Sequence, residues 1–372
     1  MKDSDSFDGN IMQVQVLSSA PIKERKVEMI KYLSLFSGIG AFESAMKNLK
    51  IPFEITNYCE IGLPQSKAYS LIHGVSEDKN LFDITEVDET KLGQVDFITY
   101  GFPCQDISRA GTQKGFTDEN GNKTRSGLFF DAARIIKATQ PKVAIAENVK
   151  PLVGKKFQEE FKLVLETLSE AGYNNYWKVL KASDFGVPQS RERVFIVSIR
   201  KDIDTGIFEF PKPYELKKCM MDYLETDVDS KYFLSDKMFA YVLDLEEKQQ
   251  GTKWEGRANN DFINPIIAHT LSVRGIKGQR AGVSNIISVK DPSPIQVLDY
   301  KKKLTSFHNS DLRNLTERES FRLMGFKDSE FEAVQNHFKQ TDLYTFAGNS
   351  IVVDVAEELL CMMFDEEGNF FV

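Results

Sequence analysis

The chain has 372 residues, of which 41% are hydrophobic and 27% charged, values typical of a globular protein with one large or two medium-sized domains. Its four cysteines are scattered, with no CxxC pair and no Cys/His cluster, so neither a metal site nor a disulfide scaffold is expected. The net charge of −8 argues against indiscriminate nucleic-acid binding.

Neither a secretory signal nor a membrane span is predicted. The first thirty residues are polar and mixed in charge, without the apolar stretch of a signal peptide. No run of about 18 apolar residues occurs anywhere in the chain. We therefore expect a cytoplasmic protein, with residues 1–30 as an N-terminal extension.

Strand-like and helical segments alternate over the first two hundred residues. The expected strands are 32–36, 53–58, 96–100, 143–146 and 194–199, with a further short one before Asp83. The expected helices are 41–46, 65–73, 128–139 and 157–171. This alternation implies parallel pairing and right-handed crossovers. We predict a Rossmann-like, doubly wound α/β domain over residues 31–200.

The alternation stops after Arg200. Residues 201–325 contain most of the irregular Pro, Gly and Lys stretches, which indicates a second, smaller, irregular β-rich domain. From about Leu343 a strand, a turn and a helix are expected. The apolar run 351–364 should form that helix and pack back on the first domain, so residues 326–372 return to it.

Two glycines follow the first strand, in Phe36-Ser37-Gly38-Ile39-Gly40, and open the first helix. Glycines at such a turn let the backbone approach a ligand closely. Glu60 ends the second strand, where an acid typically holds ribose hydroxyls, and Asp83-Ile84 could flank an adenine. Since the third glycine of a dinucleotide fingerprint is missing, the pattern favours S-adenosylmethionine over NAD.

A cysteine and a glutamate follow two further strands. Cys104 stands in Gly101-Phe102-Pro103-Cys104-Gln105, and Glu147 begins Glu147-Asn148-Val149, 43 positions later. A sulfur nucleophile and a proton-managing carboxyl are the minimum needed for covalent attack on an electron-poor ring. The alternatives are an inert buried cysteine and a capping or salt-bridged carboxylate.

Five short motifs occur in order along the chain. They are Phe36-Ser37-Gly38-Ile39-Gly40, Gly101-Phe102-Pro103-Cys104-Gln105, Glu147-Asn148-Val149, Gln189-Ser190-Arg191-Glu192-Arg193 and Gly348-Asn349-Ser350. In this order they resemble the cytosine-C5 DNA methyltransferase family of the bacterial restriction-modification type. The resemblance runs from about Lys31 to Phe364, apart from the variable region.

The resemblance implies covalent catalysis on a cytosine flipped out of the duplex. Cys104 would add to C6 of the ring, and Glu147 would bond N3 and the exocyclic amine. Arg193 would bond O2, while Arg191 would order the nucleophile loop or a phosphate.

The resemblance also implies S-adenosylmethionine as cofactor. Ile61 stands where some members carry an aromatic residue, so the adenine would pack against an aliphatic side chain. The implied cofactor-binding residues are Phe36, Gly38, Ile39, Gly40, Glu60, Ile61, Asp83, Ile84, Pro103, Leu128, Asn349 and Ile351.

Double-stranded DNA is the implied substrate. Residues 108–124 would form a mobile loop, with Ser108 or Arg109 entering the gap left by the flipped base. Residues 251–322 hold twelve basic and seven acidic residues, so the rest of the chain carries about −13. Thr270, Arg274 and Arg280 resemble the start of a recognition loop, although each arginine could equally hold a phosphate or lie on plain surface.

Competing interpretations are a tRNA cytosine-5 methyltransferase and an inactive, sequence-specific DNA-binding regulator. The chain lacks the Cys-Phe-Thr tripeptide of the tRNA-acting relatives, and its intact Cys104 and Glu147 argue against a regulator.

Thr316 and Glu319 have the spacing of a helix capping box and are expected to be structural. We expect a monomer, and the resemblance allows a cognate restriction endonuclease that acts on the same site.

Replacing the proposed nucleophile tests the covalent mechanism. Cys104→Ala should abolish methyl transfer, because no sulfur remains to attack C6, and should leave DNA binding largely intact. Transfer of a labelled methyl group and a gel-shift titration measure the two properties. Retained methyl transfer would refute the covalent route.

Overall fold

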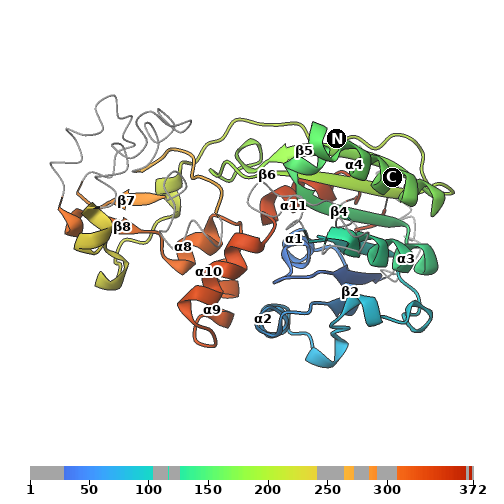
Figure 1. Cartoon of the computed structure of the whole chain (residues 1–372), viewed down its shortest axis with the longest axis horizontal. Helices are drawn as coiled ribbons and strands as arrows, with labels where there is room; N and C mark the ends of the chain where they lie inside the picture. Colours follow the sequence, from blue (N-terminus) through green and yellow to red (C-terminus); the bar gives the residue numbers. More distant parts are fainter. Residues whose placement is uncertain are drawn as a thin grey trace, which may run out of the picture.

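The computed structural model describes residues 29–103, 116, 126–240, 264–271, 285–290, 308–365 and 368–370. A six-stranded sheet forms the larger half of the molecule (Figure 1). Its strand order is β2-β1-β3-β4-β6-β5. The strands are β1 (Ile30–Leu35), β2 (Phe53–Cys59), β3 (Phe97–Tyr100), β4 (Val143–Val149), β5 (Tyr173–Lys181) and β6 (Glu192–Arg200).

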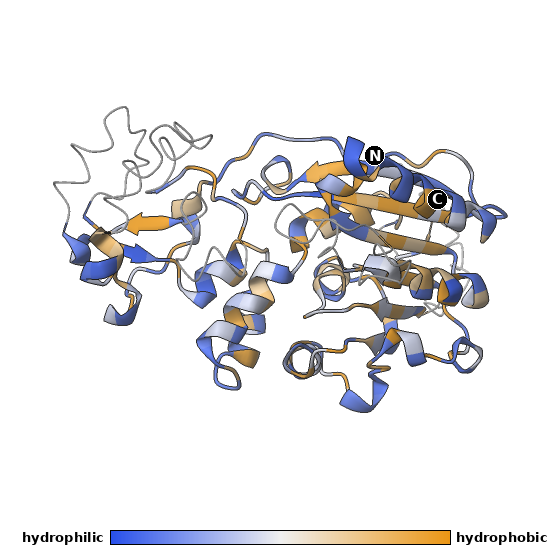
Figure 2. Ribbon diagram, in the orientation of Figure 1, coloured by the Kyte–Doolittle hydropathy of each residue, from blue (hydrophilic) through white to orange (hydrophobic). Residues whose placement is uncertain are grey.

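Helices cover both faces of this sheet, as the predicted Rossmann-like fold requires. The helices of this half are α1 (Ala41–Asn48), α2 (Leu63–His73), α3 (Phe129–Thr139), α4 (Gln158–Glu170) and α11 (Val353–Cys361). Side chains alternate between the faces of a strand, so Tyr32 packs with α1 and α11, and Leu33 packs with α3 and α4. Figure 2 shows the central strands as strongly hydrophobic, as expected for a sheet buried on both faces.

The sheet is parallel only in part, which corrects the expectation of parallel pairing throughout. β1 to β4 pair in parallel, but β6 runs antiparallel to both β4 and β5. The strand β5 was not predicted. It is joined to β6 by a short loop without a long helix, and such a connection favours an antiparallel pair.

Two other expected strands are wrong. The segment before Asp83 makes a single parallel bridge, between Tyr58 and Asn80. The segment around Tyr344 belongs to the helix α10 (Gln340–Asn349). Its buried residues Leu343, Phe346 and Ala347 are spaced by three and four positions, which is the period of a helix. The predicted last helix is confirmed, since α11 packs against α1.

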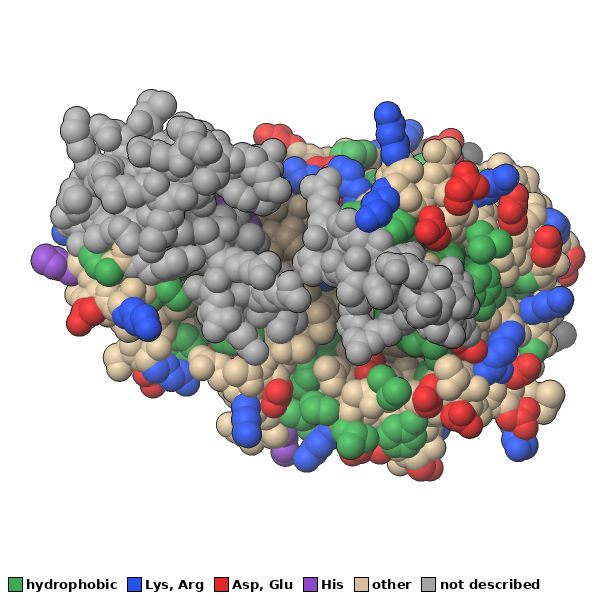
Figure 3. All heavy atoms as spheres, viewed as in Figure 1, with side chains coloured by type: hydrophobic (Ala, Val, Ile, Leu, Met, Phe, Trp, Pro, Cys, Tyr) green, Lys and Arg blue, Asp and Glu red, His purple; other side chains and the backbone are tan. Residues whose placement is uncertain are grey.

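The smaller half holds a two-stranded antiparallel sheet of β7 (Ile286–Ser288) and β8 (Leu312–Asn314). The helices α8 (Glu317–Arg322), α9 (Asp328–Val334) and α10 lie between this pair and the large sheet (Figure 1). Over the larger half, Lys and Arg side chains are interspersed with Asp and Glu on the visible face (Figure 3). None of the helices in the described ranges is long and apolar enough to cross a membrane.

A buried ion pair joins β8 to α8. Arg313 and Glu319 are 2% and 0% exposed, and two hydrogen bonds of 2.8 Å connect the guanidinium to the carboxylate. The predicted capping box is confirmed: Thr316 N donates to Glu319 Oε2 and Glu319 N donates to Thr316 Oγ1. Glu225 N also donates to Glu319 Oε1. Every bond of this carboxylate therefore holds the start of α8 in place.

Removing one member of the buried ion pair should destabilise the protein strongly, because the other charge would stay buried without its partner. We expect Arg313→Met to lower the free energy of unfolding by about 3–5 kcal/mol. Lys162→Met is the matched control, since Lys162 and Glu166 form an exposed pair at 3.6 Å that should contribute less than about 1 kcal/mol. Urea denaturation measures both, and equal losses would contradict a special role of the buried pair.

Candidate active site

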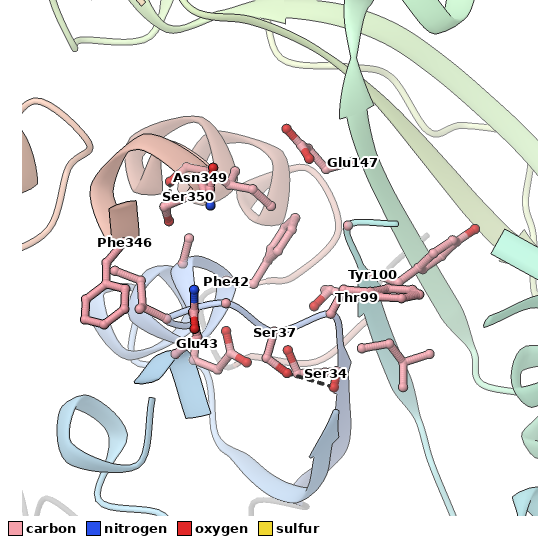
Figure 4. Close-up of a pocket in the computed structure, with 18 of the residues that line it drawn as sticks. Ser34, Ser37, Phe42, Glu43, Thr99, Tyr100, Glu147, Phe346, Asn349 and Ser350 are labelled. Carbon is pink, nitrogen blue, oxygen red and sulfur yellow. Dashed lines mark hydrogen bonds between the residues drawn. The ribbon is translucent and has the colours of Figure 1, made fainter. Parts of the chain in front are cut away.

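An open cavity lies at the carboxyl ends of β1 and β3 (Figure 4), where open α/β sheets bind their ligands. We call residues 36–40 the glycine turn and this space the glycine-turn cavity. In Figure 4, Glu147, Asn349 and Ser350 lie on the side opposite Ser34 and Ser37. The lining residues are Ser34, Leu35, Phe36, Ser37, Gly38, Ile39, Ala41, Phe42, Glu43, Gln65, Thr99, Tyr100, Gly101, Glu147, Thr345, Phe346, Asn349, Ser350 and Ile351.

The glycine turn has an unusual backbone. Phe36, Gly38 and Gly40 have φ angles of 54°, 57° and 80°, all in the left-handed region. This region costs a phenylalanine conformational energy, and such strain is found most often at functional sites. The turn thereby exposes backbone groups to the cavity.

Glu60 holds the turn from the end of β2. Gly38 N donates to Glu60 Oε2 at 2.9 Å, and Gly62 N donates to Glu60 Oε1 at 2.7 Å. Burial raises the pKa of Glu60, while the two main-chain donors oppose that change. Each oxygen retains a lone pair that could accept a bond from a ligand hydroxyl.

Glu147 and Arg193 form an ion pair at the far side of the cavity. Arg193 Nε lies 2.9 Å from Glu147 Oε1, and the side chains are 19% and 13% exposed. Burial raises the pKa of Glu147, although Arg193 and Arg191 act in the opposite direction. A carboxyl that retains its proton more readily than usual can donate to a ring nitrogen.

Two side chains fix the end of β3 beside Glu147. Asn148 Nδ2 donates to the Phe102 carbonyl at 3.0 Å. Ser126 Oγ, in the short 3-10 helix Ser126–Leu128, donates to the Pro103 carbonyl at 2.8 Å. The next residue, Cys104, lies outside the described residues. The chain is therefore held firmly up to the position before the predicted nucleophile.

Arg191 is 4% exposed and lies among main-chain carbonyls. Its Nη1 donates to the carbonyls of Leu271 and Gly348, at 3.0 and 3.2 Å, and its Nη2 donates to that of Ser350 at 2.5 Å. These contacts connect the start of β6 to two distant segments. One of them, the end of α10, lines the glycine-turn cavity.

The structure brings six of the predicted catalytic and cofactor residues into the lining of one cavity, and Glu60 adjoins it through Gly38. The six are Phe36, Gly38, Ile39, Glu147, Asn349 and Ile351.

The other described candidates lie around this cavity without lining it. Ile61 is 69% exposed, and Ile84 is buried in the core beside α3. The Asp83 side chain accepts from Thr85 N and caps a 3-10 turn. Leu128 ends the 3-10 helix that holds Pro103, and Gly40 packs against α2.

For the predicted DNA contacts, the structure describes only Thr270. Its N–H donates to Ser190 Oγ at 3.1 Å, which places it beside the arginine motif. Ser108, Arg109, Arg274 and Arg280 lie outside the described residues.

Sequence reasoning did not select several lining residues. Glu43 and Phe42 follow the glycine turn on α1, and Phe346 stands on α10. A helix that begins at the turn directs its first residues toward the same space, so the position of Phe42 and Glu43 was a usable signal. Within the described ranges, no group of three or more His, Cys, Asp or Glu side chains could hold a metal ion.

Comparison with known proteins identifies the family. The profile of C-5 cytosine-specific DNA methylases matches residues 30–364. The chain belongs to this family. It is therefore a DNA cytosine-5-methyltransferase, as its five ordered motifs predicted, and its reaction requires a methyl donor.

Bacterial relatives match over most of their length. The type II methyltransferase M2.ScrFI of Lactococcus lactis subsp. cremoris is 34% identical, over 87% of this chain and 82% of its own. M.NlaX of Neisseria lactamica is 34% identical, over 88% of this chain and 94% of its own. M.HhaI of Haemophilus parahaemolyticus is 30% identical, over 90% and 94%.

Solved structures share the fold at lower identity. The Entamoeba histolytica methyltransferase EhMeth superposes with a TM-score of 0.69 at 20% identity, covering 90% of this chain and 98% of that one. The S. pombe Dnmt2 methyltransferase superposes with a TM-score of 0.64 at 22% sequence identity, covering 89% of this chain and 97% of that one. This likeness confirms the Rossmann-like methyltransferase fold.

Neutral replacement of the cavity carboxyl tests its importance. We expect Glu147→Gln to lower the single-turnover rate of methyl transfer by about 10²- to 10⁴-fold, the usual contribution of acid–base catalysis. Glu192→Gln is the control, because Glu192 neighbours Arg193 but pairs with Lys150 at the surface, and its rate should stay near wild type. Similar rates of methyl transfer for both variants would show that Glu147 does not take part in the reaction.

Proposed function

We propose that the chain transfers a methyl group from S-adenosylmethionine to C5 of a flipped-out cytosine in a short duplex DNA sequence, through a covalent Cys104 adduct. One observation carries the proposal: Glu147 and the glycine turn line the same cavity. Residues 101–103, which join β3 to Cys104, begin beside Glu147 at Gly101 and are fixed by Asn148 through the Phe102 carbonyl.

The described residues fit this cofactor. Glu60 retains acceptor capacity for ribose hydroxyls beside the glycine turn, and residues 36–39 of that turn line the cavity. Phe36 and Ile351 supply apolar lining, and Asn349 supplies an amide. When bound, S-adenosylmethionine supplies the methyl group as an electrophile.

The protein groups activate the cytosine. The Cys104 sulfur forms a bond to C6, the electron pair of the C5–C6 double bond moves toward C5, and Glu147 stabilises the protonated N3. The Arg193 guanidinium, 2.9 Å from Glu147, is placed to bond O2. After C5 is methylated, a water molecule accepts the C5 proton, the electron pair of that C–H bond restores the C5–C6 double bond, and the sulfur leaves C6 as a thiolate.

Base flipping exposes the cytosine, at a cost of a few kcal/mol of unpairing and unstacking. We assign sequence reading to residues 201–325, with Thr270 at the start of the recognition loop. Ser190 and Gln189 bond the backbone of Thr270 and Leu271, so this loop begins next to Arg193. Relatives named as type II methyltransferases support the proposal that this chain works alongside a restriction endonuclease of the same specificity. We further propose that it acts as a monomer.

Methyl transfer to mixed-sequence duplex DNA tests the proposal directly. Labelled S-adenosylmethionine should label the DNA, and bisulfite sequencing should find protected cytosines in one short recurring sequence. The Cys104→Ala protein is the matched control and should protect none. Labelling of tRNA instead of DNA would favour the RNA substrate, and labelling of neither would favour an inactive binder.

A further inference from the structure

A histidine on α2 contacts the glycine turn from the side away from the cavity. We propose that His73, fixed by Lys47, is a positioning residue that holds the glycine turn in its cofactor-binding shape. The inference rests on the proposed use of this cavity for S-adenosylmethionine. His73 is 9% exposed, and its Nε2 lies 2.9 Å from the Ile39 carbonyl. Ile39 itself lines the cavity.

Lys47 determines which ring nitrogen of His73 carries the proton. Lys47 Nζ lies 3.0 Å from His73 Nδ1. An ammonium group donates hydrogen bonds and accepts none, so Nδ1 must be the acceptor. The proton of the neutral ring then resides on Nε2, which donates to the Ile39 carbonyl. Burial and the nearby Lys47 charge lower the pKa of His73 to about 3, which keeps the ring neutral.

The close approach of His73 explains the glycine at position 40. A Cβ built on Gly40 would lie 2.1 Å from His73 Nε2 and 2.8 Å from Cδ2. Gly40 therefore leaves space for the ring that bonds the neighbouring carbonyl. Its conformation, with φ of 80°, is one that glycine adopts without strain.

A second hydrogen bond from α2 reaches Glu43, in the first turn of α1. Tyr69 stands one helical turn before His73, and their rings are 4.7 Å apart. Tyr69 OH donates to Glu43 Oε1 at 2.8 Å, and both side chains are almost fully buried. Glu43 lines the cavity as Ile39 does, so α2 bonds cavity-lining residues on both sides of Gly40.

The histidine lies between two cavities. A second one, with a volume of about 550 Å³, is lined by His73 and Lys47 together with Gly74 and Lys50. His73 therefore borders open space on one side and, on the other, packs against Tyr69 and close to Gly40. The hydrogen bonds from Lys47 to His73 and from His73 to Ile39 support the turn from this side.

Two replacements of His73 separate the hydrogen bond from the ring. His73→Phe keeps a ring but leaves the buried Ile39 carbonyl without its donor. We expect it to weaken binding of S-adenosylmethionine about tenfold, as expected for a lost buried partner. His73→Gln keeps an N–H near the Nε2 position and should bind within about threefold of wild type. Equilibrium dialysis with labelled S-adenosylmethionine measures both.

Kinetics distinguish positioning from general destabilisation. His73→Phe should raise KM for S-adenosylmethionine while kcat at saturating cofactor changes much less. Tyr173→Phe is the matched control, because Tyr173 also donates a buried hydrogen bond to a main-chain carbonyl, that of Pro141 at 2.8 Å. It should lower the melting temperature without changing cofactor affinity. The Lys47→Met protein should fold, because Lys47 lies at the surface. It should bind S-adenosylmethionine about threefold more weakly than wild type.

The outcomes are distinct. A wild-type protein that does not bind S-adenosylmethionine would contradict the proposed cofactor and this inference together. Wild-type binding with unchanged affinity in His73→Phe and Lys47→Met would overturn this inference alone. Equal weakening in His73→Phe and His73→Gln would show that the ring, and not its N–H, supports the turn, and would also overturn it.

Discussion

The three hydrogen bonds from Arg191 to main-chain carbonyls hold the site together. They join the start of β6 to Leu271, 80 residues away, and to Gly348 and Ser350, 157 and 159 residues away. A guanidinium can make these bonds at once because its donors form a rigid planar fork. The segment that supplies Asn349 is thus attached to the strand that carries Arg193, and the segment that holds Leu271 is attached at the same point.

The two partly buried carboxyls near the cavity, Glu60 and Glu147, differ in their bonding partners. In both, burial raises the pKa. The oxygens of Glu60 accept from two main-chain amides, which suits a fixed acceptor for a ligand. Glu147 faces one arginine across a 2.9 Å contact, which leaves it able to exchange a proton. Two glutamates near one cavity therefore have different surroundings: main-chain amides around Glu60 and a guanidinium beside Glu147.

Local patterns predicted much of the fold and part of the site. The apolar runs 32–36, 53–58, 96–100 and 143–146 located β1 to β4, because parallel strands buried on both faces are nearly continuous in hydrophobicity. The strand β5 was not predicted because it lies at the edge of the sheet. Trp177 in it is 45% exposed, and polar residues interrupt its apolar sequence.

The remaining features depend on contacts across long sequence separations. The partners of Arg191 stand at least 80 residues away, and no local pattern indicates which carbonyls a buried arginine will meet. The same holds for Asn148, which bonds a carbonyl 46 residues earlier. The mistaken strand around Tyr344 has a simpler cause, since its spacing of three and four positions fits a helix.

The glycine-turn cavity is built from segments near the start and near the end of the sequence. One wall comes from residues 34–43 and the opposite wall from residues 345–351. During synthesis on the ribosome, the first wall emerges when most of the protein is still to be made, and the cavity closes only after the second wall follows. A prematurely terminated chain that lacks residues 345–351 would therefore lack one wall of this cavity.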